Sequence, residues 1–158
     1  LSFFFLRLLE MGVSDIVVPL VYLVYNMIYM AASIPAGRLS DRIGRKKVMI
    51  AGFALYVITA TGFALLDSIL MAWVLMGFFG LHMALTDATA RAFVSDLASE
   101  EVRGTALGIY HTGTGVVDLP AGVLAGTLWA QFSSTATFLV GAVLALISIA
   151  ILATVKEE

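Results

Sequence analysis

Two long runs without a charged residue flank one short basic segment, and this pattern constrains the fold more than any other feature. The runs cover residues 16–37 and 48–66, and neither contains Asp, Glu, Lys or Arg. A helix rises about 1.5 Å per residue, so each run can cross the roughly 30 Å hydrocarbon core of a bilayer. The short basic segment between them predicts two neighbouring membrane spans joined on one side of the membrane.

The composition excludes an ordinary soluble domain. Of the 158 residues, 61% are hydrophobic and 13% are charged, which is typical of a multi-pass membrane protein. The chain has no cysteine, and its two histidines lie at no ligand spacing, so we expect neither disulfides nor a metal site. The sequence contains no nucleophile–base pair and no nucleotide-binding loop. We therefore expect no enzyme, no cofactor and no nucleic-acid partner.

The sequence predicts a single all-α membrane domain over residues 1–158. Residues 1–11 are apolar but too short to cross, and we interpret them as the outer end of a helix whose beginning is missing. Five complete spans are predicted at residues 16–36, 48–66, 69–94, 104–130 and 136–155. Because the chain opens with Leu rather than Met, we expect it to be an internal fragment.

The distribution of Lys and Arg predicts which ends of the spans are cytoplasmic. Five basic residues lie in segment 38–47, and the same side of the predicted spans also carries Arg91, Arg103 and Lys156. Arg7 alone falls on the opposite side. Basic residues are retained on the cytoplasmic face. We therefore predict a plasma-membrane (bacterial inner-membrane) protein with segments 38–47 and 95–103 and the C-terminus in the cytoplasm.

The basic segment reads Gly37-Arg38-Leu39-Ser40-Asp41-Arg42-Ile43-Gly44-Arg45-Lys46-Lys47. Its pattern, G-x-L-x-D-R-x-G-R-K-K, closely resembles the conserved cytoplasmic loop of the major facilitator superfamily, a large class of secondary transporters. Residues 95–108 are similar to the linker between helices 10 and 11 of many bacterial members. The resemblance implies the C-terminal half of a twelve-helix fold, from the end of helix 7 through helix 12, with helices 1–6 missing.

The chemistry of this motif suggests roles for five of its residues. Gly37 and Gly44 permit close backbone approach or a positive φ at helix ends. Asp41 can accept hydrogen bonds from the N-terminus of a partner helix, whereas Arg42 and Arg45 can bind a carboxylate or a lipid phosphate. The resemblance implies that Asp41 and an Arg latch the two halves in the outward-facing state. The alternative is a basic loop that only sets the topology.

A stripe of small and polar residues follows one face of the predicted span 104–130. Its members are Gly108, His111, Gly115, Asp118, Gly122 and Gly126. Small residues let helices pack closely in lipid, and a mid-membrane Asp is costly, so we expect Asp118 to face protein or water rather than lipid. Asp118 is predicted either to carry protons, with His111 as a relay, or to remain protonated as a buried hydrogen-bond donor.

Two further polar faces complete the candidate pathway. In span 69–94, Asp87 and Arg91 share a small-residue face and are spaced as an (i, i+4) pair. They are predicted to belong to a proton or solute pathway or, alternatively, to form a local salt bridge. In span 16–36, Tyr22, Asn26 and Tyr29 share a face that either lines a cavity or packs against a helix.

Together these features predict a secondary active transporter that moves a small solute by alternating access and is driven by protons. Its expected partners are the solute, protons, the lipid bilayer and the missing N-terminal half of the same chain. The alternative is a stand-alone half-transporter that forms a homodimer or serves as a membrane scaffold without transport.

Overall fold

The computed structural model describes residues 1–155, which form six α-helices and no strand. In chain order the helices are α1 (Ser2–Glu10), α2 (Val17–Ile43), α3 (Arg45–Ala64), α4 (Ile69–Leu97), α5 (Arg103–Gln131) and α6 (Ser134–Thr154). The all-α fold predicted from the apolar runs is confirmed. The predicted position of Lys156 and the C-terminus lies outside the described residues.

Four of these helices, α2, α3, α4 and α6, are long and apolar enough to cross a membrane. The helix α5 has 29 residues but is not among the four. Several glycines, Asp118 and Pro120 lie within it and lower its hydropathy. Its crossing of the membrane therefore stays a prediction.

The junction between α2 and α3 is tighter than the sequence predicts. We expected residues 38–47 to form a loop, but only Gly44 separates the two helices. Gly44 has φ +97° and ψ 142°, a conformation that strains any residue with a side chain. The helix α2 also continues through Pro35, which membrane helices tolerate. The expectation for Gly37 is wrong, because it lies inside α2 without a positive φ, and a Cβ added there would meet no atom within 4 Å.

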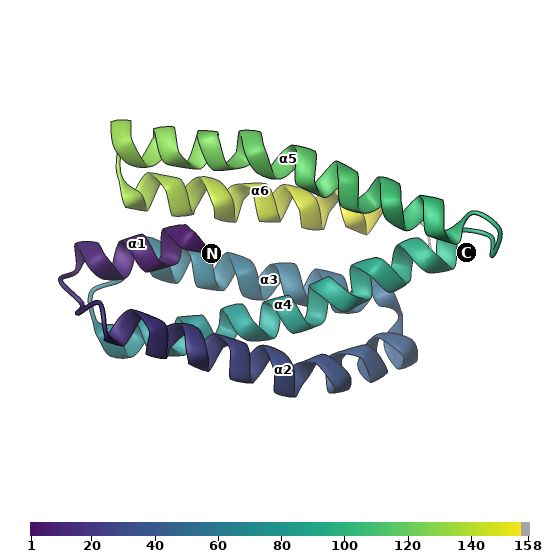
Figure 1. Ribbon diagram of the computed structural model, residues 1–158, viewed down its shortest axis with the longest axis horizontal. Coiled ribbons are helices and arrows are strands. Elements are labelled where there is room, and N and C mark those ends of the chain that lie inside the picture. The colour runs from purple at the N-terminus through teal and green to yellow at the C-terminus, as the bar shows by residue number, and fades with distance from the viewer. Residues whose placement is uncertain (156–158) are drawn as a thin grey trace.

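The helix α4 lies at the centre of the bundle, packing on α2 and α3, while α3 packs on α6 (Figure 1). The ring of Phe4 in α1 contacts three other helices. Its centroid lies 4.6 Å from that of Phe63, 4.8 Å from that of Phe79 and 5.2 Å from that of Phe138. This buried aromatic cluster holds the short α1 against α3, α4 and α6.

Two glycines bring helices into close contact with α4. A Cβ at Gly80 would lie 2.7 Å from the backbone oxygen of Tyr25 in α2. A Cβ at Gly52 of α3 would lie 2.5 Å from Cγ2 of Thr86 in α4. The small-residue face of α4 is therefore a packing surface against α2, which is how membrane helices approach one another without a Cβ between them.

The helix α5 differs from the others because none of its residues is buried. Added Cβ atoms at the glycines of its stripe would meet no atom within 4 Å; these are Gly108, Gly115, Gly122 and Gly126. Figure 1 shows the reason, since α5 lies at the edge of the bundle beside α6 and meets α4 near one end. Within residues 1–155 Asp118 and His111 are exposed, so close packing of this face against protein stays a prediction for the full-length protein.

The connections alternate between the two ends of the bundle (Figure 1). Gly44, residues 98–102 and the end of α6 lie at one end, whereas residues 11–16, 65–68 and 132–133 lie at the other. The second predicted cytoplasmic segment, 95–103, is shortened to 98–102 because α4 continues to Leu97 and α5 begins at Arg103. The order of the ends agrees with the alternation that the basic residues predict.

We predict that the end carrying Gly44 faces the cytoplasm. In intact cells that produce the full-length protein, Lys47→Cys should not react with a membrane-impermeant maleimide added outside, whereas Asp67→Cys should react. Both positions are exposed, and this chain has no cysteine of its own to add background. Labelling at position 47 together with protection at position 67 would show that the end carrying Gly44 faces the outside.

Candidate functional site

A charged cluster joins α4 to α2. Arg91 Nη1 donates to Asp87 Oδ1 at 2.6 Å, which is the predicted (i, i+4) salt bridge. Tyr29 Oη of α2 donates to Asp87 Oδ2, also at 2.6 Å. The Asp87 side chain is 29% exposed and that of Arg91 is 42% exposed. Both carboxylate oxygens of Asp87 thus have a partner, one on its own helix and one on α2.

The polar face of α2 contributes only Tyr29 to this charged cluster. The ring of Tyr25 lies between those of Tyr29 and Tyr22, with centroids 6.1 and 5.6 Å away. Asn26 Nδ2 donates to the backbone oxygen of Tyr22 at 2.9 Å. Tyr22 and Asn26 therefore lie on the same face of α2 as Tyr29, but neither of them bonds Asp87.

A second cluster surrounds Arg45 at the α2–α3 junction. Arg45 Nη1 donates to Asp41 Oδ1 at 3.0 Å and to Ser40 Oγ at 3.2 Å, both near the end of α2. Its Nε donates to Asp96 Oδ2, near the end of α4. One guanidinium therefore joins the ends of α2 and α4. We expected Arg45 to bind a carboxylate or a lipid phosphate, and it binds two carboxylates. Arg42, for which the same ligands were expected, is exposed.

Sequence reasoning did not single out Asp96, which completes the Arg45 cluster. The residue lay within the predicted segment 95–103, where it had no evident partner. The available signal was its position at the end of a long span on the same side as the basic motif. That signal is weak because it places Asp96 and Arg45 at the same depth without showing that α3 and α4 are neighbours.

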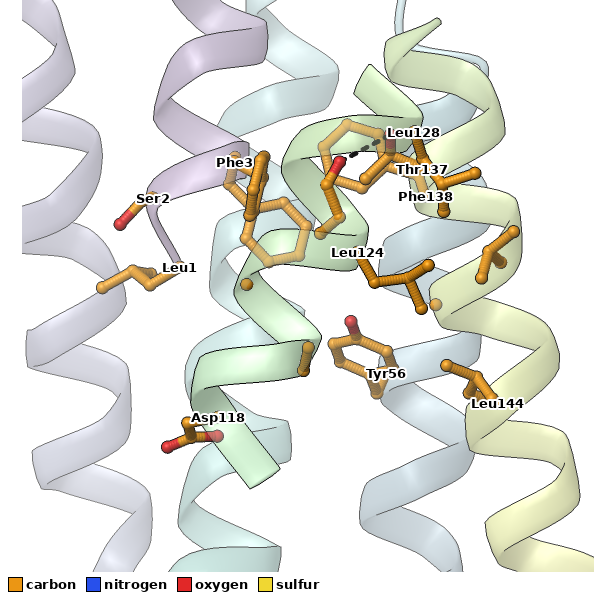
Figure 2. A pocket seen from close by; sticks show the side chains of 16 residues that line it. Leu1, Ser2, Phe3, Tyr56, Asp118, Leu124, Leu128, Thr137, Phe138 and Leu144 are labelled. Carbon is orange, nitrogen blue, oxygen red and sulfur yellow. Dashed lines mark hydrogen bonds between the residues drawn. The ribbon is translucent and has the colours of Figure 1, made fainter. Parts of the chain in front are cut away.

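Asp118 and His111 belong to neither cluster. Asp118 lines a cavity of about 610 Å³ between α1, α3, α5 and α6, in which Tyr56 and Thr137 are further polar residues. Figure 2 shows Asp118 at one end of this cavity, on the side of α5 that faces away from Leu144. Among residues 1–155, no side chain donates a hydrogen bond to Asp118, and no three His, Asp or Glu side chains gather as a metal site.

Comparisons with known proteins identify the family. The model of the Major Facilitator Superfamily matches residues 2–158. The uncharacterized MFS-type transporter MJ1317 of Methanocaldococcus jannaschii is 42% identical over 144 residues, which are 91% of this chain and 36% of that protein. The inner membrane transport protein YajR of Escherichia coli is 30% identical over 141 residues, 89% of this chain and 30% of its own length.

A third relative matches a shorter part of the chain. The arabinose-proton symporter of Escherichia coli is 35% identical over 75 residues, 48% of this chain and 16% of that protein. No solved structure matches the chain. The chain spans 36% and 30% of the first two relatives, about a third of their length. With the family match over nearly all residues and four helices long and apolar enough to cross a membrane, this chain is part of a multi-pass membrane protein and belongs to the Major Facilitator Superfamily.

Proposed function

We propose that the full-length protein is a secondary active transporter that moves a small solute by alternating access, coupled to protons, and that this chain is its C-terminal half. The family and the relatives, which are transporters by name, support transport as the activity. The observation that carries the proposal furthest is the Tyr29–Asp87–Arg91 cluster. Charged side chains inside a membrane helix are costly, and they mark ion and solute pathways.

The Arg45 cluster supports a role for Asp41 as the cytoplasmic latch. Arg45 bonds one oxygen of Asp41, whose side chain remains 65% exposed. The other oxygen is therefore open to the N-terminus of a helix from the N-terminal half, where the dipole favours an anion. In this proposal Arg45 orients Asp41 from one side and binds Asp96 on the other, so the latch is connected to α4.

Asp118 is the residue that we propose as the proton carrier. It is exposed and lines the cavity between α1, α3, α5 and α6, so water can reach its carboxylate. His111 lies seven residues away along the same face, about 10 Å along the helix axis. This separation exceeds hydrogen-bond reach, so a proton passes between the two only through a chain of water molecules along the face that we expect to meet the N-terminal half.

The proposed function is tested with the wild-type full-length protein in proteoliposomes. One relative is a proton symporter for arabinose by name, so the panel of solutes begins with arabinose and other small sugars. We expect at least one solute to change the external pH when it is added to weakly buffered vesicles. If no solute of the panel changes the external pH and no solute is exchanged, the result would favour a membrane scaffold without transport.

Asp118→Asn should abolish uphill accumulation while solute exchange survives. Asparagine keeps the size and much of the hydrogen bonding of Asp, but it cannot bind and release a proton. Accumulation driven by an imposed pH gradient and exchange at equal pH are measured in the same proteoliposomes. Asp67→Asn, which removes an exposed carboxylate from the α3–α4 connection, is the matched control. Full pH-driven accumulation by Asp118→Asn would show that this carboxylate does not couple protons.

A further inference from the structure

The side chain next to Arg45 makes a connection that the latch does not require. Lys46 is the second residue of α3, and its Nζ donates to the backbone oxygens of Ala153, at 2.8 Å, and Val155. Both oxygens lie at the end of α6. Arg45 reaches α2 and α4, whereas Lys46 reaches α6. Two adjacent residues of one motif therefore contact the ends of three helices.

The residues at the end of α6 bond only part of its last carbonyl groups: Thr154 Oγ1 donates to the backbone oxygen of Ile151, and the amide of Val155 donates to that of Leu152. The last carbonyl groups of a helix lack partners within the helix, and they form the negative end of its dipole. The last turn of α6 has no basic residue. An ammonium group has three donors and no acceptor, so the single ammonium of Lys46 can bond two of these carbonyl groups. A residue of α3 thus caps the end of α6.

The other end and the middle of α6 are also held to α3. Thr135 Oγ1, near the start of α6, donates to the backbone oxygen of Ala64 at the end of α3, at 3.2 Å. In the middle, a Cβ at Gly141 would lie 3.1 Å from the hydroxyl oxygen of Tyr56. The helices α3 and α6 are therefore in contact along their length and bonded at both ends, in contrast to α5, which buries no residue.

We propose that Lys46 is a positioning residue that locks α6 to α3, so that the two helices move as one rigid pair when the Arg45 cluster opens or closes. The movement rests on the proposed transport cycle, whereas the cap exists whether or not the protein transports. In this arrangement the basic motif has two separate tasks. Arg45 connects the latch residue Asp41 to α4, and Lys46 keeps α3 and α6 together.

Hydrogen–deuterium exchange of the full-length protein in lipid nanodiscs tests the cap. Lys46→Met keeps the apolar stem and removes the donors, so amides at the end of α6, residues 149–155, should exchange about three- to tenfold faster, the range for losing one hydrogen bond at a helix end. Lys46→Arg keeps the charge and should restore protection. Lys47→Met removes the same charge from the next, exposed residue and should leave α6 unchanged.

Distances between spin labels test the rigid pair. Labels at exposed positions of α3 and α6, introduced as Ala54→Cys and Ile151→Cys, should give one narrow distance distribution at acidic and at alkaline pH. Lys46→Met should broaden this distribution, and Lys47→Met should not. Where Lys46→Met does not yield folded protein, Lys46→Gln is compared with Lys46→Arg in both measurements.

The two proposals fail in different ways. Unchanged exchange in Lys46→Met, or equal effects of Lys46→Met and Lys47→Met, would overturn the role of Lys46. If Lys46→Met speeds exchange at the end of α6 but the wild-type protein moves no solute, the cap stands and the proposed transport is overturned. A wild-type distance between α3 and α6 that changes with pH would overturn the rigid pair.

Discussion

Asp87→Asn should destabilise the full-length protein, and Arg91→Gln added to it should restore part of the lost stability. The single variant leaves the Arg91 guanidinium without its carboxylate inside a membrane helix. Breaking a buried ion pair costs about 3–5 kcal/mol, whereas exposed pairs contribute about 0–1 kcal/mol. Because these side chains are 29% and 42% exposed, we expect a loss of about 1–3 kcal/mol, between the two limits.

A double-mutant cycle measures this coupling directly. The midpoint of thermal unfolding in detergent is determined for the wild type, Asp87→Asn, Arg91→Gln and the double variant. Asp67→Asn, at an exposed position outside any cluster, controls for the loss of a carboxylate. Strictly additive effects of the two single variants would mean that Asp87 and Arg91 do not stabilise each other, and that the ion pair does not contribute to the stability of the protein.

Gly80→Ala should destabilise the protein by a similar amount through packing rather than charge. The added methyl group would lie 2.7 Å from the backbone oxygen of Tyr25 and 3.3 Å from the backbone nitrogen of Tyr29. Backbone atoms cannot rotate away, so α4 has to move from α2, which also lengthens the hydrogen bond from Tyr29 to Asp87. Overpacking of this kind costs about 1–3 kcal/mol.

Gly113→Ala in α5 is the matched control for Gly80→Ala. A Cβ at Gly113 would meet no atom within 4 Å, so this variant should leave the unfolding midpoint unchanged or raise it slightly through the higher helix propensity of Ala. The same thermal unfolding measurement serves both variants. Equal midpoints for Gly80→Ala and Gly113→Ala would show that the contact between α2 and α4 tolerates a methyl group.

The helices could be predicted from the sequence, but their ends at the basic motif could not. Charge-free runs of this length predict membrane helices directly. The charge-free run and the basic motif after it place the end of the first full span at residue 36, yet α2 continues through Pro35 to Ile43. Proline is a weak stop signal in a membrane helix, because neighbouring groups satisfy the freed carbonyl. Gly44 was correctly identified as a position for a positive φ, and it is the residue that ends α2.

The candidate site was partly predictable for a related reason. The bond between Arg91 and Asp87 follows from (i, i+4) spacing within one helix. The bonds from Tyr29 to Asp87 and from Arg45 to Asp96 join different helices. They depend on how α4 packs against α2 and α3, which glycines such as Gly80 determine in three dimensions. Asp118 stays a prediction, because no helix within residues 1–155 covers its face of α5.

Accessibility of one residue from both sides of the membrane tests alternating access most directly. Asn26 lies on the polar face of α2 and is partly exposed. We predict that Asn26→Cys in the full-length protein reacts with an impermeant maleimide from outside in right-side-out vesicles and from the cytoplasmic side in inside-out vesicles. Asp41→Asn should shift the reaction toward the cytoplasmic side by weakening the latch. Reaction from one side only, in both kinds of vesicle and with either residue at position 41, would contradict alternating access.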